Sequence, residues 1–114
     1  MTNQHRQKQL WIGLVEVRAG DKGSPILGDT KGAFANILTW ASNVEEYERN
    51  ARLVIGELGG TYVSEIIDPE PLEQRKAKRG GHLDEEIEEM ASRAEGNPDA
   101  IIYGTFHTYE RDDA

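Results

Sequence analysis

The chain contains no cysteine, and this absence excludes several kinds of chemistry. Without thiols there is no disulfide framework, no thiolate metal site and no cysteine nucleophile. No apolar run approaches the roughly 20 residues of a membrane-spanning helix, and the polar start of the chain lacks the apolar stretch of a signal peptide. We therefore expect a cytoplasmic protein that has no membrane partner.

Positive charge is also scarce, since 13 lysines and arginines face 21 aspartates and glutamates, which gives a net charge of −8. The whole excess lies in residues 58–114, which hold six basic and fourteen acidic residues. Binding to a nucleic acid needs a broad cationic surface, so we expect no nucleic-acid partner. The short basic run at residues 75–79 is predicted to be a solvated loop that neighbouring carboxylates partly neutralise.

The overall amino-acid composition is typical of one globular domain. Hydrophobic residues make up 37% of the chain and charged residues 30%, both close to globular averages. A chain of 114 residues can bury one core without disulfide or metal staples. We expect a single domain at residues 10–109, between flexible tails at 1–9 and 110–114.

The first half of the domain predicts two strands and a helix. Residues 10–18 are apolar on both strand faces, which is typical of a central strand, and residues 33–41 predict a second strand. The glycine-rich segment 19–32 predicts a long loop that joins the two strands as an antiparallel hairpin. Ser42-Asn43-Val44-Glu45 predicts a capping box with Ser42 as N-cap, opening a helix that stops at Gly59-Gly60.

The second half predicts strands at 61–67 and 100–109, and between them an amphipathic helix at 82–95. A short helical turn at 70–78, with Leu72 directed inward, precedes that helix. The predicted order is β-β-α-β-α-β, an α+β fold. We expect a two-layer sandwich in which a mainly antiparallel four-stranded sheet carries both helices on one face. Over residues 10–109 this pattern resembles a ferredoxin-like arrangement with one strand moved to the front, and the resemblance implies no function.

The last predicted strand suggests an open sheet face. Tyr103, Thr105, His107 and Tyr109 alternate along it, so a regular strand would present all four on one side. Exposed aromatic area on a monomer is unusual, and large aromatic side chains anchor interfaces, for which Trp11 and Trp40 are candidates. Our leading hypothesis is a non-enzymatic module that binds a second copy or another protein through this face.

A second hypothesis is a small-molecule-binding protein or enzyme with a pocket between that face and the 19–32 loop. His107 would be the acid or base, and Glu16 could be its partner if it points the same way. No catalytic motif supports an enzyme. The histidines lack metal-ligand spacing, and Asp29 replaces the lysine that a phosphate-binding loop requires, so we expect no metal or cofactor.

A third hypothesis uses the acidic helix as a docking face for a basic protein, as an immunity or antitoxin protein does. Its carboxylates are Asp84, Glu85, Glu86, Glu88 and Glu89. Charge complementarity of this kind accelerates association and weakens with added salt.

Overall fold

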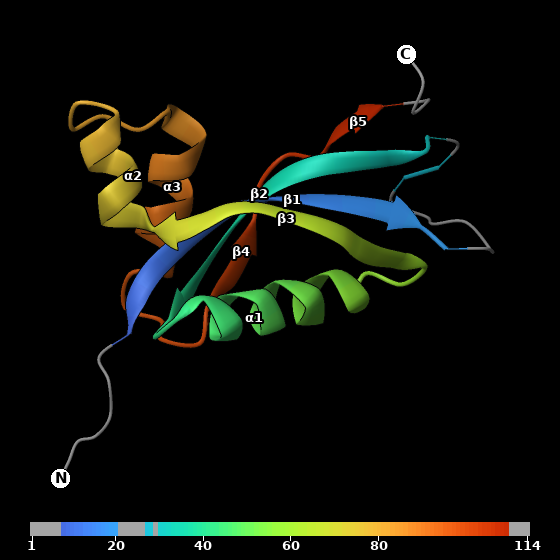
Figure 1. Cartoon of the computed structure of the whole chain (residues 1–114), viewed down its shortest axis with the longest axis horizontal. Coiled ribbons are helices and arrows are strands. Elements are labelled where there is room, and N and C mark those ends of the chain that lie inside the picture. The colour runs from blue at the N-terminus through green and yellow to red at the C-terminus, as the bar shows by residue number, and fades with distance from the viewer. Residues whose placement is uncertain (1–7, 21–26, 29, 110–114) are drawn as a thin grey trace, which may run out of the picture.

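The computed structural model describes residues 8–20, 27–28 and 30–109, and within them the chain forms five strands and three helices. The strands pair antiparallel in the order β3-β1-β2-β4, and β5 lies beside another part of β2 (Figure 1). The α+β class with a mainly antiparallel sheet is therefore confirmed. The elements are β1 (Gln9–Ala19), β2 (Gly32–Ala41), α1 (Val44–Gly56), β3 (Thr61–Pro71), α2 (Leu72–Lys78), α3 (Glu85–Ala94), β4 (Ile101–Tyr103) and β5 (His107–Tyr109).

β1 is a central strand, as its apolar faces predict. It forms the expected hairpin with β2, in register from Gln9 opposite Ala41 to Arg18 opposite Gly32, and it pairs with β3 on its other side. Alternate residues serve two separate cores: Val15 and Val17 pack with α1, whereas Ile12 packs with α2 and α3. Both faces of the sheet are thus buried along part of their length.

The helices lie on opposite faces of the sheet, and not on one face as expected. α1 packs below the sheet in Figure 1, and the α2–α3 pair packs above one end of it. The physical reason is the second apolar face of β1, which would otherwise remain exposed to water. A two-layer ferredoxin-like arrangement is not confirmed.

The N-terminus of α1 is capped one residue later than predicted. The Asn43 side chain accepts a hydrogen bond from the Glu46 amide at 2.9 Å, and the Glu46 carboxylate accepts one from the Ser42 amide at 2.7 Å. Asparagine caps a helix as well as serine does, and the glutamate needed for the return bond lies three residues after Asn43. The predicted Ser42–Glu45 pairing is therefore wrong in register, although the helix itself is confirmed.

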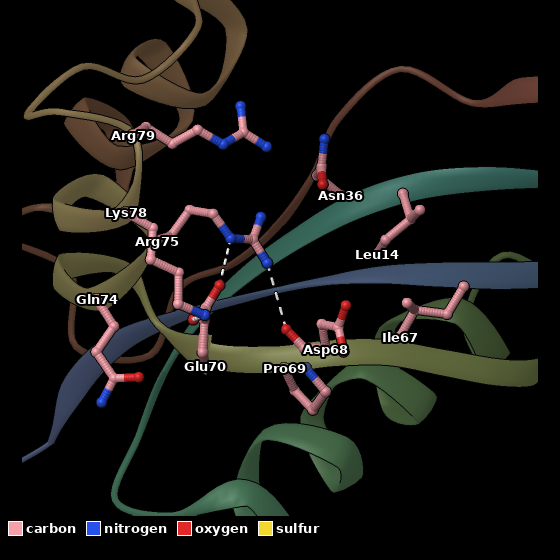
Figure 2. Close-up of a pocket in the computed structure, with 10 residues that line it drawn as sticks. All are labelled: Leu14, Asn36, Ile67, Asp68, Pro69, Glu70, Gln74, Arg75, Lys78 and Arg79. Carbon is pink, nitrogen blue, oxygen red and sulfur yellow. Dashed lines mark hydrogen bonds and ion pairs between the residues drawn. The ribbon is translucent and has the colours of Figure 1, made fainter.

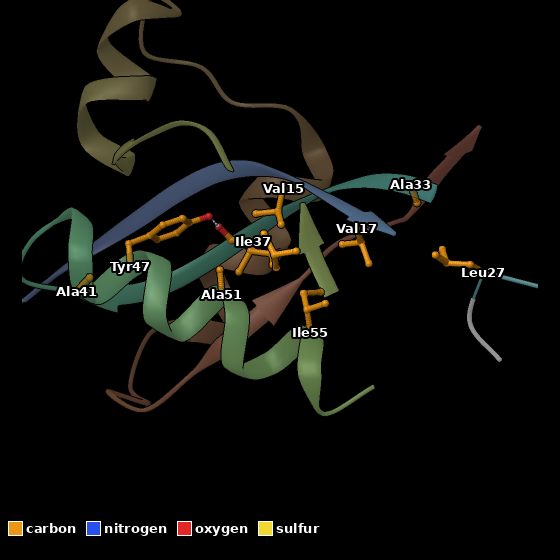
Figure 3. Packing of buried hydrophobic residues seen from close by; sticks show 10 residues of the cluster. Val15, Val17, Leu27, Ala33, Ile37, Ala41, Tyr47, Ala51 and Ile55 are labelled. Carbon is orange, nitrogen blue, oxygen red and sulfur yellow. Dashed lines mark hydrogen bonds between the residues drawn. The ribbon is translucent and has the colours of Figure 1, made fainter. Parts of the chain in front are cut away.

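Tyr47 fixes α1 against the sheet at a glycine. Its ring is fully buried, and its hydroxyl donates to the Ile37 carbonyl at 2.8 Å, as Figure 3 shows. A Cβ at Gly13 would lie 2.8 Å from that hydroxyl oxygen, so only glycine lets β1 pass beneath the ring. Burial raises the pKa of Tyr47, so the phenol remains protonated and able to donate.

β3 runs four residues past its predicted end at Ile67. Two register shifts interrupt its pairing with β1, one at Ser64 and one at Asp68-Pro69. As an edge strand, β3 can hold Pro69 and Pro71, whose missing N–H groups would break a central ladder. α2 begins immediately afterwards with Leu72 buried, as expected.

Some predicted segments lie outside the described residues. These segments are residues 1–7 and 110–114 of the predicted tails and residues 21–26 and 29 of the predicted loop. Gln9, which was predicted to belong to the N-terminal tail, is the first residue of β1. In the described part of the chain, every helix is too short and too polar to cross a membrane.

Replacing Gly13 by alanine should lower the free energy of unfolding by about 1–3 kcal/mol, because the new methyl group overpacks against the Tyr47 hydroxyl. The control is Gly56→Ala, at the last residue of α1, where a Cβ would meet open space. That change should be neutral or stabilise by up to about 1 kcal/mol. Urea denaturation of both variants compares them, and equal effects would contradict this packing account.

Candidate functional site

The face of the sheet that carries α2 and α3 is covered at one end only. Beyond these helices, β1 presents Leu14, Glu16 and Arg18, opposite Asn36 and Phe34 of β2. Ile67 of β3 pairs with Leu14 on the same face. We call these six residues the open half-face; among the described helices none lies over it (Figure 1).

The last predicted strand is broken, and its four candidate residues do not share a face. Residues 104–106 join β4 to β5 opposite only two residues of β2, because Tyr103 pairs with Ile37 and His107 pairs with Phe34. The one extra residue between β4 and β5 reverses which side chains point to each face of the sheet. Tyr103 therefore lies on the α1 face with Phe106, 5.3 Å between ring centroids, while His107 and Tyr109 lie on the side of the open half-face.

Two contacts explain the break. The Gly104 amide donates to the Asn36 carbonyl at 2.9 Å, and a Cβ there would lie 3.0 Å from the Glu86 carboxylate. That carboxylate accepts hydrogen bonds from the Thr105 amide, at 2.9 Å, and from its hydroxyl group. Thr105 is thus bound to α3 and is no part of an open row. The same bonds lower the pKa of Glu86.

The two tryptophans lie on opposite faces of the sheet, both outside the open half-face. Trp11 stacks on Tyr47 on the α1 face with 6.3 Å between ring centroids, and its buried indole N–H has no partner among the described residues. The indole N–H of Trp40 donates to the Ala94 carbonyl of α3 at 3.0 Å. Both rings help to pack helices on the sheet, and their predicted role as interface anchors stays untested.

Glu16 and His107 point to the same face but are not neighbours, since Phe34 pairs with both and lies between them. The Glu16 carboxylate is already occupied. It accepts hydrogen bonds from the Tyr109 hydroxyl and, at 2.8 Å, from the Ser64 hydroxyl. These bonds, that of Tyr109 foremost, lower the pKa of Glu16. Glu16 thus ties β5 to β1 and has no contact with His107 that would support proton transfer.

The predicted acidic docking residues divide into two groups. Asp84 is the N-cap of α3 and accepts from the Ile87 amide at 3.0 Å, and Glu86 binds Thr105, so both carboxylates serve the fold. Glu85, Glu88 and Glu89 are exposed. In the described residues no group of three or more metal-ligating side chains comes together.

A pocket of about 710 Å³ opens where α2 meets the open half-face (Figure 2). Side chains of the sheet, of the end of β3 and of α2 surround it. They are Leu14, Asn36, Ile67, Asp68, Pro69, Glu70, Gln74, Arg75, Lys78 and Arg79. Its position next to α2 differs from the pocket expected beside the 19–32 loop.

Glu70 is the electrostatic centre of the pocket wall. It is only 8% exposed, and its two carboxylate oxygens accept from Lys78 Nζ at 2.7 Å and from Arg75 Nε. The Arg75 guanidinium also donates to the Asp68 carbonyl at 3.3 Å. The hydrogen bonds from Lys78 and Arg75 hold the pKa of Glu70 below its usual value. The predicted partial neutralisation of the basic run is therefore confirmed, since one carboxylate pairs with two of its cations, but residues 75–78 belong to α2 and not to the predicted loop.

Arg79 differs from these two cations, because its guanidinium makes no hydrogen bond or ion pair within the described part of the chain. It is the C-cap of α2, which ends in a Schellman motif: Gly81 N donates to the Lys76 carbonyl at 2.9 Å and Gly80 N to that of Ala77 at 3.2 Å. Both glycines have positive φ. This turn places the Arg79 side chain over the pocket, facing Asn36 in Figure 2.

Asn36 and Asp68 present further polar groups whose side chains have no hydrogen-bond partner among the described residues. Asn36 belongs to β2 and is half-buried on the open half-face. Asp68 lies in a β-bulge of β3 with a φ of 49°, the only positive φ among the described residues other than glycine. Leu14, Ile67 and Pro69 add an apolar floor.

Sequence reasoning missed this pocket. Its polar residues come from two distant segments, Asn36 of β2 and residues 68–79, and the basic run was the one feature that marked any of them. Neither a family model, nor a curated protein, nor a solved structure matches the chain.

Glu70→Gln should lower the free energy of unfolding at pH 7 by about 1.5–3 kcal/mol, because two cations lose a charged acceptor. Since pairing lowers the pKa of Glu70, its stabilising effect is present above the ordinary carboxyl pKa and is lost as the pH falls through the lowered value. The difference from wild type should therefore shrink in acid. Urea denaturation over a pH series measures it.

The matched control is Glu73→Gln, which changes an exposed carboxylate in the first turn of α2. This variant should stay within about 0.5 kcal/mol of wild type. An equal loss in the two variants at pH 7 would show that Glu70 does not secure α2.

Proposed function

We propose that the protein binds a small molecule that carries an oxyanion, a carboxylate or a phosphate, and an apolar part. One observation carries this proposal: the Arg79 guanidinium faces the Asn36 amide over the apolar floor of the pocket, and neither side chain has a partner among the described residues. This is the small-molecule binding of our second hypothesis, with the pocket at α2 and not beside the 19–32 loop.

The chemistry of the two groups supports an anionic ligand. A guanidinium presents paired N–H donors that match a carboxylate or phosphate, and the Asn36 amide adds two donors. The lining holds three cations, Arg75, Lys78 and Arg79, against the carboxylates of Asp68 and Glu70. The pocket thus has a local excess of positive charge in a chain whose net charge is −8.

The volume and the apolar lining of the pocket also support the binding of a small molecule. Its volume of about 710 Å³ falls within the roughly 300–1,000 Å³ typical of small-molecule sites. Leu14, Ile67 and Pro69 can bury the apolar part of a ligand, while the polar groups around them set its orientation.

Arg79→Gln should weaken binding of 3-phenylpropanoate and of phenyl phosphate by roughly 10- to 100-fold, the loss expected when a charged hydrogen bond is removed. Two-dimensional NMR titration measures the affinity and identifies the amides that shift. Comparing the two probes distinguishes a carboxylate site from a phosphate site.

Arg52→Gln is the control, because it removes the same charge from an exposed position on α1, across the sheet. Its affinity for both probes should equal that of wild type. Equal binding by the Arg79 variant, or shifts confined to residues outside the pocket, would refute the proposal.

We propose, as a second function, that another copy of the chain packs on the open half-face. Tyr62 favours this, because it pairs with Arg18 beside that face and is 50% exposed. Exposed aromatic side chains of this kind are enriched at interfaces. The acidic docking role of α3 remains a hypothesis that no contact in the structure favours.

Light scattering over a hundredfold dilution tests this second function. Tyr62→Asp should shift a dimer to monomer, whereas Leu53→Asp should not, since Leu53 is similarly exposed, at 55%, but lies on α1. A wild-type protein that is monomeric at every concentration rules out the dimer.

A further inference from the structure

We infer that the ligand of this pocket also carries a cationic amino group, held by Asp68, so that the preferred class is an ω-amino carboxylate. This inference rests on the proposed function and names the ligand more closely. It starts from the charges of the pocket that remain after its internal ion pairs are formed.

Internal pairing leaves one cationic and one anionic side chain without a partner in the described lining. Glu70 is saturated by Arg75 and Lys78, which removes two cations and one carboxylate from those available to a ligand. The Arg79 guanidinium and the Asp68 carboxylate have no partner in the part of the chain that the structure describes. A ligand with only an anionic group would leave the Asp68 carboxylate facing it, and like charges repel.

The backbone directs Asp68 to the pocket. Between Leu14 opposite Ile67 and Ile12 opposite Glu70, β1 has one residue and β3 has two, so Asp68 and Pro69 form a bulge. Bulges change the direction of a side chain, and aspartate is one of the few residues other than glycine that adopt positive φ readily. Figure 2 shows the Asp68 carboxyl group rising from β3 toward the pocket.

The Arg79 guanidinium and the Asp68 carboxylate lie on different walls of the pocket. Arg79 follows α2, whereas Asp68 lies on β3, and Figure 2 shows them on opposite sides of the Arg75 side chain. Ile67 and Pro69 flank Asp68 in sequence and add apolar surface to the lining. A ligand whose amino and carboxylate groups are joined by a methylene chain satisfies both charges and the apolar floor at once.

The experiment compares ω-amino carboxylates with carboxylates that lack the amine. The probes are 4-aminobutanoate and 6-aminohexanoate, against butanoate and hexanoate, titrated by NMR into wild-type protein. We expect at least one amino compound to bind at least 5-fold more tightly than its matched carboxylate. The chain length that binds best reports the separation of the two charges.

Asp68→Asn should abolish this preference while the plain carboxylates bind as well as before or better. Asparagine tolerates the same positive φ, so the bulge is preserved. Glu65→Gln is the control, an exposed carboxylate on the same strand outside the pocket lining, and it should keep the preference.

Two results would overturn the inference, and they separate it from the proposed function. If plain carboxylates bind and the amino compounds bind no better, or if Asp68→Asn keeps the preference, the assignment of Asp68 fails and the anion site stands. If neither these four compounds nor 3-phenylpropanoate and phenyl phosphate shift any amide of the pocket, both proposals fail.

Discussion

The ion pairs of Glu70 are the interaction on which the site depends. A buried carboxylate at the end of β3 binds Arg75 and Lys78 from α2 and so holds that short helix against the sheet edge. A helix of seven residues has little stability of its own, so tertiary contacts must fix it. By pairing with two cations and leaving the third, the same contacts decide which charge the proposed ligand would meet. The position of α2 and the charge of the pocket wall therefore depend on one carboxylate.

Small irregularities in strand pairing determine where the polar side chains lie. The bulge at Asp68-Pro69 turns an aspartate of an edge strand toward the pocket. The extra residue between β4 and β5 sends Tyr103 and His107 to opposite faces. A shift of one residue reverses the face of every side chain that follows it, which is why such irregularities matter more here than the lengths of the strands.

Two tyrosine rings each lie over a glycine of the sheet, and each hydroxyl group holds a different element in place. Tyr47 passes over Gly13 to bond the Ile37 carbonyl and fix α1. Tyr109 passes over Gly32, where a Cβ would lie 2.6 Å from its hydroxyl oxygen, to bond Glu16 and hold β5. In each case the ring occupies the space that a side chain would need. The Tyr109 bond leaves Glu16 saturated and so removes it from the groups that a ligand could reach.

The sequence was enough to predict the elements: the central hairpin, α1, α2 with Leu72 inward, α3 and the antiparallel α+β class all follow from hydrophobic period and turn residues. It also indicated that carboxylates neutralise part of the basic run. Three-dimensional contacts were needed to show which face each helix covers, that Asn43 caps α1, that the last strand breaks, and that Asn36, Asp68 and Arg79 surround one pocket. Local patterns report short-range preferences, whereas the covered faces, the strand bulges and the meeting of Asn36 with residues 68–79 depend on contacts between residues far apart in the chain.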